Sequence, residues 1–329
     1  MAPRSRFGLI ASLAALAMGG CSGCNSGTAP TADSAALASA ASASASAAVE
    51  APPPWIGMPR QKSEVDAVIN KSKREPYSGK TGTLTGRITM KGDPAPSTAF
   101  IYPQECAEAA GTYGRAFRVG QDDALADVLV TVTGYEAFVP AAGPVLPVKI
   151  SGCAFDKRTY AMAFGQRIEV SNTDVKGSFM PVLDPSEYRA MNIALPKGSP
   201  VKIYAYQPGI NYVLRDIQGK EFMQADVFVL KFATLDTTGL DGRYKISGIP
   251  VGKVQVNALL PVIDKSAKQE IEIKEGDNTL DLELTYSAKD DKIIERPASP
   301  WARGLGSAAV IPSSGKYGTP PAPGSNIVQ

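Results

Sequence analysis

The chain has 329 residues, with 34 Lys and Arg against 32 Asp and Glu and no histidine. A charge balance this close to neutral, without a basic stripe, argues against nucleic-acid binding. The missing histidines exclude sites that need an imidazole, among them Ser-His-Asp and Cys-His nucleophiles, His-ligated zinc and blue copper. We therefore expect no cofactor.

Residues 1–20 have the layout of a secretory signal peptide, in which two arginines precede an apolar stretch too short to span a bilayer. The Met-Gly-Gly-Cys that ends at Cys21 resembles a bacterial lipoprotein processing box, whose cysteine is diacylated, for example with palmitate. Cys24 is the alternative, but Cys21 would then stand where leucine is usual. No aspartate follows Cys21, so the resemblance implies lipid anchoring at the outer membrane, facing either the periplasm or the cell surface.

Two segments are expected to lack structure. Residues 21–57 are rich in Ala, Ser and Pro, and residues 289–329 are rich in Pro, Gly and Ser. Neither segment has an apolar period or enough apolar surface to offset the entropy cost of ordering it. We expect a tether after the anchor and a disordered tail.

Residues 58–80 are expected to contain one short helix laid on a sandwich. Ser63-Glu64-Val65-Asp66 has the pattern of a capping box. Val65, Val68 and Ile69 then share one helical face.

The rest of the folded region, up to residue 288, has an almost wholly β pattern. Short runs alternate apolar and polar residues between Gly, Pro, Asn and Asp turns, which is typical of sandwiches. Asp241-Gly242 predicts a hairpin turn. The fold class is therefore all-β, and the length favours two small β-sandwiches over one.

Cys106 and Cys153 are the only cysteines inside the folded region. In the oxidising compartment that a signal peptide implies, a disulfide between them is expected. A metal or redox role would require further ligands or a CxxC spacing within the fold. Cys24 is left as an odd thiol in the tether.

Five motifs follow one another through the folded region: Gly152-Cys153-Ala154-Phe155, Gly165 to Asp174, Pro208-Gly209 with Arg215-Asp216-Ile217-Gln218, Phe222-Met223, and Asp241 to Lys253. Their order resembles bacterial envelope proteins that join a cupredoxin-like (plastocyanin/azurin-type) sandwich to a transthyretin-like, carboxypeptidase-regulatory-like sandwich. The resemblance implies a cupredoxin-like domain over residues 81–232 and a regulatory-like domain over residues 233–288.

The chain departs from that family at the copper ligands. Ser178 stands at the position of the first histidine, Arg215 at that of the cysteine and Gln218 at that of the second histidine. Met223 lies near the position of the axial methionine. The resemblance thus implies a cupredoxin-like fold whose former metal site is degenerate, because blue copper needs two imidazoles and a thiolate.

Two neighbouring features leave alternatives open. Met180, Met191 and Met223 are either core residues or a soft thioether site for Cu(I). The charged residues of this loop form either a partner surface or a solvated loop; they are Arg215, Asp216, Lys220 and Glu221.

These observations favour a lipid-anchored envelope protein, not an enzyme, that binds or scaffolds a protein or glycan partner and attaches to the membrane through its anchor. A copper carrier that uses methionines is one alternative. A carbohydrate-active protein with paired carboxylates is a second, since glycosidases need no histidine.

Overall fold

The computed structural model describes residues 59–175, 177–185 and 192–296. Cys21, Cys24, Met191, the predicted tether and most of the predicted tail lie outside the described residues. No helix in this described part of the chain is both long and apolar enough to cross a membrane.

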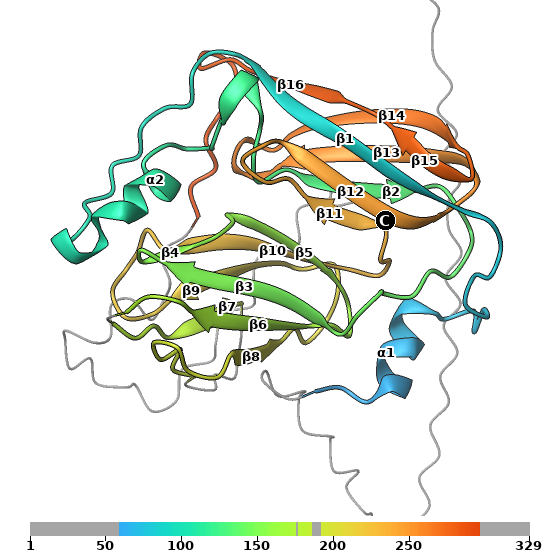
Figure 1. Ribbon diagram of the computed structural model, residues 1–329, viewed down its shortest axis with the longest axis horizontal. Coiled ribbons are helices and arrows are strands. Elements are labelled where there is room, and N and C mark those ends of the chain that lie inside the picture. The colour runs from blue at the N-terminus through green and yellow to red at the C-terminus, as the bar shows by residue number, and fades with distance from the viewer. Residues whose placement is uncertain (1–58, 176, 186–191, 297–329) are drawn as a thin grey trace, which may run out of the picture. The chain divides into compact units, whose positions relative to one another are not determined.

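The described chain is mainly β, as Figure 1 shows, which confirms the predicted all-β class. Its α-helices are α1 (Lys62–Ile69) and α2 (Ala110–Tyr113), and its 3-10 helices are η1 (Gln104–Ala109), η2 (Gln121–Asp123) and η3 (Pro261–Ile263). The strands are β1 (Thr81–Gly92), β2 (Leu129–Thr133), β3 (Val145–Ser151), β4 (Ala154–Phe155), β5 (Thr159–Ala163), β6 (Arg167–Asn172), β7 (Pro181–Asp184), β8 (Val201–Tyr204), β9 (Asn211–Asp216), β10 (Gln224–Leu230), β11 (Leu235–Thr237), β12 (Arg243–Pro250), β13 (Gly252–Leu260), β14 (Lys265–Ile273), β15 (Gly276–Thr279) and β16 (Leu282–Tyr286).

The first sandwich consists of two four-stranded sheets, with the strand orders β5-β10-β9-β7 and β4-β3-β6-β8. Strand β10 runs parallel to β5 and antiparallel to β9, and β3 runs parallel to β6. Alternate residues of these strands point inward, so Tyr160 and Met162 of β5 join Ile168, Tyr212 and Val227 in one buried core. These two sheets confirm a β-sandwich in this part of the chain.

The second sandwich is built around β1. This strand pairs with β12, and in parallel with β15 near its start and with β16 near its end. The other sheet has the order β11-β2-β13-β14. Leu84 and Ile88 of β1 are buried together with Val256 of β13 and Leu284 of β16.

The predicted domain limits assign two strands to the wrong sandwich. Strands β1 and β2 fall within the range 81–232 expected for the first sandwich, yet β1 pairs with β12, and β2 pairs with β11 and β13. Alternation identifies a strand but not its partner, because the choice of partner depends on contacts between distant segments. Strands β3 to β10 of the first sandwich are therefore inserted between β2 and β11 of the second.

The predicted helix is confirmed as α1, although its start differs. The backbone N–H of Gln61 donates to the Glu64 carboxylate at 3.2 Å, so Gln61 is the cap and not Ser63. Val65, Val68 and Ile69 pack against the core of the first sandwich, as their shared face predicts.

The turn at Asp241-Gly242 forms, with Gly242 at a φ of +69°, but it does not close a hairpin. It joins β11 to β12, and these strands belong to different sheets of the second sandwich. A positive-φ glycine suits many tight turns, so the dipeptide alone does not determine which strands pair.

An apolar cluster and a buried ion pair lie between strands of the two sandwiches. The cluster consists of Leu129, Ala161, Phe228 and Leu230, with Phe232, Leu235 and Leu259 packed against it. Just before β2, the Asp127 carboxylate accepts hydrogen bonds from Nε and Nη2 of Arg118, both at 2.7 Å. The same carboxylate accepts the backbone N–H of Arg158 at 2.7 Å.

Candidate functional site

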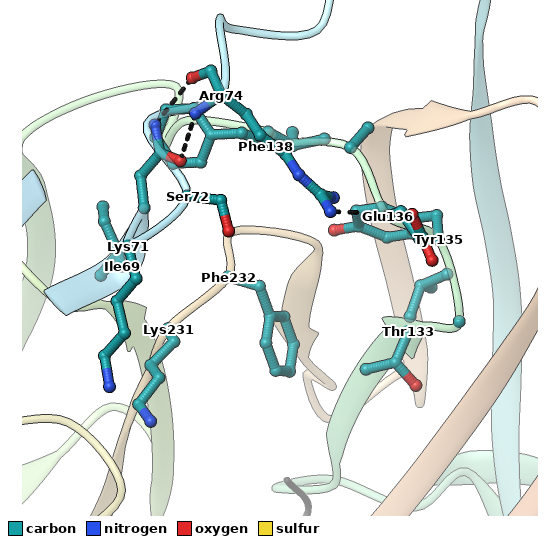
Figure 2. Close-up of a pocket in the computed structure, with 15 residues that line it drawn as sticks. Ile69, Lys71, Ser72, Arg74, Thr133, Tyr135, Glu136, Phe138, Lys231 and Phe232 are labelled. Atoms are coloured by element: carbon teal, nitrogen blue, oxygen red, sulfur yellow. Dashed lines mark hydrogen bonds and ion pairs between the residues drawn. The ribbon is translucent and has the colours of Figure 1, made fainter. Parts of the chain in front are cut away.

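A pocket of about 420 Å³ lies between connecting segments of the described chain (Figure 2). We call it the connector pocket. Three segments line it: the end of α1 and the loop toward β1, the end of β2 and the loop after it, and the loop between β10 and β11. The lining residues are Ile69, Asn70, Lys71, Ser72, Arg74, Val132, Thr133, Gly134, Tyr135, Glu136, Ala137, Phe138, Val139, Lys231 and Phe232.

The first wall is held in shape by the amide of Asn70. Its Nδ2 donates to the Arg74 carbonyl oxygen at 2.7 Å, and its Oδ1 accepts the Arg74 backbone N–H at 2.9 Å. The backbone N–H of Tyr77 then donates to the carbonyl oxygen of Phe138 at 2.8 Å, which attaches this wall to the second. These bonds restrict the backbone of the loop before any ligand arrives.

Tyr135 is held by a short chain of hydroxyl groups. The Thr234 hydroxyl donates to the Val132 carbonyl oxygen at 2.7 Å, and it lies 2.6 Å from the Tyr135 hydroxyl. Since Thr234 has a single hydroxyl proton, Tyr135 is the donor to Thr234. Burial raises the pKa of Tyr135, against the opposing effect of Thr234, so this hydroxyl stays protonated at neutral pH.

The connector pocket carries more positive than negative charge. Its lining includes three cationic side chains, those of Lys71, Arg74 and Lys231, and one carboxylate, that of Glu136. Glu136 pairs with Arg74 at 3.6 Å. Figure 2 shows this ion pair and, near Lys231, the ring of Phe232. Within the described residues, neither Lys71 nor Lys231 has an ion-pair partner. The pocket therefore combines two available ammonium groups with the rings of three aromatic residues.

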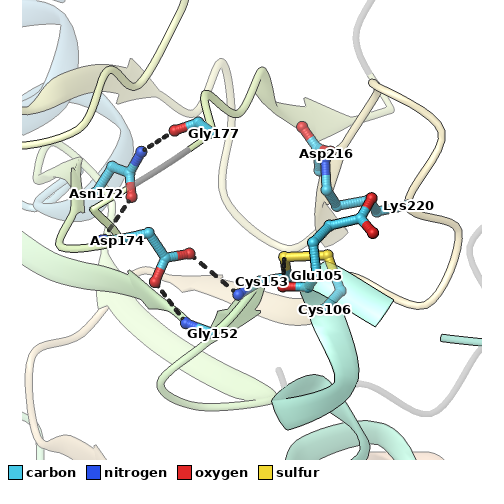
Figure 3. Close-up of a disulfide and its surroundings, with 9 residues drawn as sticks. All are labelled: Glu105, Cys106, Gly152, Cys153, Asn172, Asp174, Gly177, Asp216 and Lys220. Carbon is cyan, nitrogen blue, oxygen red and sulfur yellow. Dashed lines mark hydrogen bonds and ion pairs between the residues drawn. A yellow bond between two sulfur atoms is a disulfide. The ribbon is translucent and has the colours of Figure 1, made fainter. Parts of the chain in front are cut away.

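The predicted disulfide between Cys106 and Cys153 is confirmed, with the two Cα atoms 5.3 Å apart (Figure 3). Gly152 and Cys153 both have positive φ, so their N–H groups point to the same side. The Asp174 carboxylate accepts these N–H groups at 2.6 Å and 3.1 Å. A turn of this kind is an anion-binding nest, and here the protein's own Asp174 fills it.

The structure does not bring the predicted metal-site positions together on one face. Arg215 is 5% exposed and lies on the face of its sheet that also carries Asp226 and Phe228. Its Nε lies 3.3 Å from the Asp184 carboxylate. Met223 is fully buried in the core on the opposite face.

Ser178 and Gln218 are half-buried in loops, just before β7 and just after β9. With Arg215 held by a carboxylate and no imidazole or thiolate at these positions, the residues present do not fit a blue-copper centre.

Asp216 is the most buried charged side chain of this region, although its sequence pattern suits a solvated loop equally well. Its side chain is fully buried and points to the inner face, where Oδ1 accepts the Met180 backbone N–H at 2.7 Å. Lys220 pairs with its other oxygen at 3.4 Å and lies 4.9 Å from the centre of the Phe179 ring. The ion pair between Lys220 and Asp216 thus closes the loop. Because residues alternate between the two faces of a strand, Arg215 and Asp216 must point to opposite faces of β9, and the first residue of the strand determines which of them points inward.

The predicted methionine site is only partly described. Met180 is 7% exposed and Met223 is fully buried, while Met191 lies outside the described residues. In the part that is described, no three Cys, Asp or Glu side chains gather closely enough to hold a metal ion.

No protein-family model matches the chain, and no curated protein matches it. Among solved structures, it is similar to the copper-containing nitrite reductase of Thermus scotoductus SA-01, with 22% sequence identity and a TM-score of 0.22. The match covers 30% of this chain and 24% of that enzyme, so the chain spans about a quarter of its length. The all-β assignment follows from the strand pairing described above.

Proposed function

We propose that this chain is a lipid-anchored binding protein of the bacterial outer membrane that holds a ligand in the connector pocket and does not transform it. The anchor is assigned to Cys21, on the resemblance of residues 18–21 to a lipoprotein processing box. The partner belongs to the cell envelope, and no nucleic acid is involved.

The connector pocket is the observation that carries this proposal. Pockets that hold small molecules have volumes of roughly 300 to 1,000 Å³ and combine apolar walls with a few placed polar groups. The connector pocket, at about 420 Å³, has both. Its lining includes a single carboxylate, Glu136, already paired with Arg74, whereas hydrolysis of a glycosidic bond uses two. This supports binding without catalysis.

The binding role is tested with the purified full chain in detergent and a panel of neutral sugars, sugar acids, peptides and nucleotides. A ligand that binds only the folded state raises the melting temperature, and above the dissociation constant the stabilisation grows with the logarithm of the ligand concentration. We expect at least one class to do so and Phe232→Ala to abolish the effect. Phe100→Ala, which removes a 40% exposed ring outside the pocket, is the matched control. A panel without any shift would contradict the proposal.

The anchor is tested separately by labelling with a radioactive or clickable palmitate in a bacterial host. The wild-type chain and Cys24→Ala should carry the label and sediment with the outer membrane, because Cys21 remains. Cys21→Ala should lose the label and leave the membrane fraction. Labelling of Cys21→Ala that disappears in Cys24→Ala would instead assign the anchor to Cys24.

A further inference from the structure

We propose that the connector pocket recognises the carboxylate-bearing sugar unit of an acidic saccharide. This inference rests on the proposed binding function and deepens it by naming the ligand class. Three independent properties of the pocket point to it: its free ammonium groups, its ring faces, and a carboxylate that the protein itself places there.

The ammonium groups are those of Lys71 and Lys231, which come from different walls of the pocket. Both side chains are exposed, and neither pairs with a carboxylate within the described residues. An ammonium group is a compact charge on a flexible stem, which suits a carboxylate that arrives in more than one orientation. The two lysines supply the attraction for a negative ligand, whereas a neutral ligand would leave them unused.

The aromatic residues Tyr135, Phe138 and Phe232 are half-buried, so part of each side chain remains accessible. Flat apolar surface of this kind packs against the apolar face of a sugar ring, which a bare inorganic anion lacks. The Tyr135 hydroxyl donates to Thr234, which leaves its lone pairs to accept a hydrogen bond from a sugar hydroxyl. The hydroxyl groups of Ser72 and Thr133 add further polar contacts at the same pocket.

Glu136 shows that a carboxylate fits in front of Arg74. Its oxygen lies 3.6 Å from the guanidinium, yet its side chain is 93% exposed and that of Arg74 is 47% exposed. An ion pair so open to water is held weakly. A ligand carboxylate that reached Arg74 would take the place of Glu136 at little cost, so Glu136 acts as an internal competitor. Removing its charge is therefore expected to strengthen binding.

The decisive measurement is the calorimetric affinity of the full chain for trigalacturonate, compared with its methyl ester, which keeps the rings and removes the charges. We expect the ester to bind at least tenfold more weakly. Galacturonate itself, included as a monomer, distinguishes a free sugar acid from a saccharide chain: equal affinity per site would assign the monomer as the ligand. Inorganic phosphate tests whether charge alone suffices, and we expect no saturable binding.

Variants locate the effect in the pocket. Lys71→Gln with Lys231→Gln should weaken trigalacturonate binding about tenfold, the range expected for two exposed charge contacts. Lys73→Gln, at an exposed lysine of the same loop outside the lining, is the matched control and should have no effect. Glu136→Gln should bind severalfold more tightly. Unchanged far-ultraviolet circular dichroism would confirm that each variant is folded.

Each contrary result has a distinct meaning. Equal binding of the acid and its ester, with no effect of the double lysine substitution, would overturn the acidic ligand and leave the binding function standing. Saturable phosphate binding that matches trigalacturonate would overturn the saccharide. Binding of no compound, either here or in the wider panel, would overturn the binding function as well.

Discussion

The buried ion pair between Arg118 and Asp127 makes the sharpest stability prediction. Their side chains are 9% and 5% exposed, and Asp127 accepts three hydrogen bonds at 2.7 Å, two from Arg118 and one from the Arg158 backbone. Asp127→Asn keeps the shape of the side chain, removes its charge and leaves the guanidinium buried without a counter-charge. Breaking a buried pair in this way costs about 3–5 kcal/mol. We expect the free energy of unfolding to fall by about 3 kcal/mol, since the amide oxygen still accepts some of these bonds.

The measurement is urea denaturation of the full chain, followed by circular dichroism. Asp123→Asn is the matched control, because Asp123 forms an exposed pair with Lys91 at 2.8 Å and its loss should barely move the midpoint. A double-mutant cycle with Arg118→Gln measures the coupling free energy between the two side chains. The double variant, in which both charges are removed, should lose less free energy of unfolding than the sum of the two single variants. If Asp127→Asn moved the midpoint no further than Asp123→Asn, the buried pair would not stabilise the fold.

Three further predictions concern the two sandwiches. Reduction of the Cys106–Cys153 disulfide, which closes a loop of 47 residues, should lower the free energy of unfolding by about 4 kcal/mol on the chain-entropy estimate, measured by urea denaturation with and without dithiothreitol. Gly86→Ala would place a Cβ 1.8 Å from the carbonyl oxygen of Leu280, in the link between β15 and β16, so it should lower the melting temperature by several degrees. Gly111→Ala, with open space around it, should not, and equal melting temperatures of the two variants would contradict the close approach. Burial raises the pKa of Tyr113, so the stability that this group contributes is complete below about pH 10 and is lost as the pH rises further. The phenolate absorbance of the chain at 295 nm should therefore reach its full value only when the protein unfolds at alkaline pH, and not before.

Local signals in the sequence predict the class of the fold and its covalent link well. Val65 and Ile69 share a face because of helical periodicity, and that face does pack on a core. Cys106 and Cys153 could be paired by sequence alone, since no other cysteine lies in the folded region. The partners of β1 could not be predicted, because its pattern suits either sandwich and its pairing with β15 and β16 spans most of the chain.

The positions predicted as a degenerate metal site show that a small uncertainty in the sequence can change a functional interpretation. Successive residues of a strand point to opposite faces of the sheet. An error of one residue in aligning β9 therefore exchanges the environments expected for Arg215 and Asp216. The motif resemblance placed Arg215 at a ligand position, whereas the strand turns this residue away from the core that holds Met223. The connector pocket had no signal of any kind, because its cations and rings come from three segments that meet only in the folded chain.

The connector pocket depends on both sandwiches, although its residues lie in the connections between them. Phe232 packs against the apolar cluster that contains Phe228 of β10 and Leu129 of β2, so its place in the pocket is set by strands from both sandwiches. Tyr135 follows β2 and bonds to Thr234 just before β11, which links the second wall to the third. The strands thus form a rigid scaffold that positions the pocket side chains in the loops at their ends, where binding residues commonly occur. A fragment that held one sandwich alone would lose a wall of the pocket and expose part of the cluster, so binding and folding of the two sandwiches should be lost together.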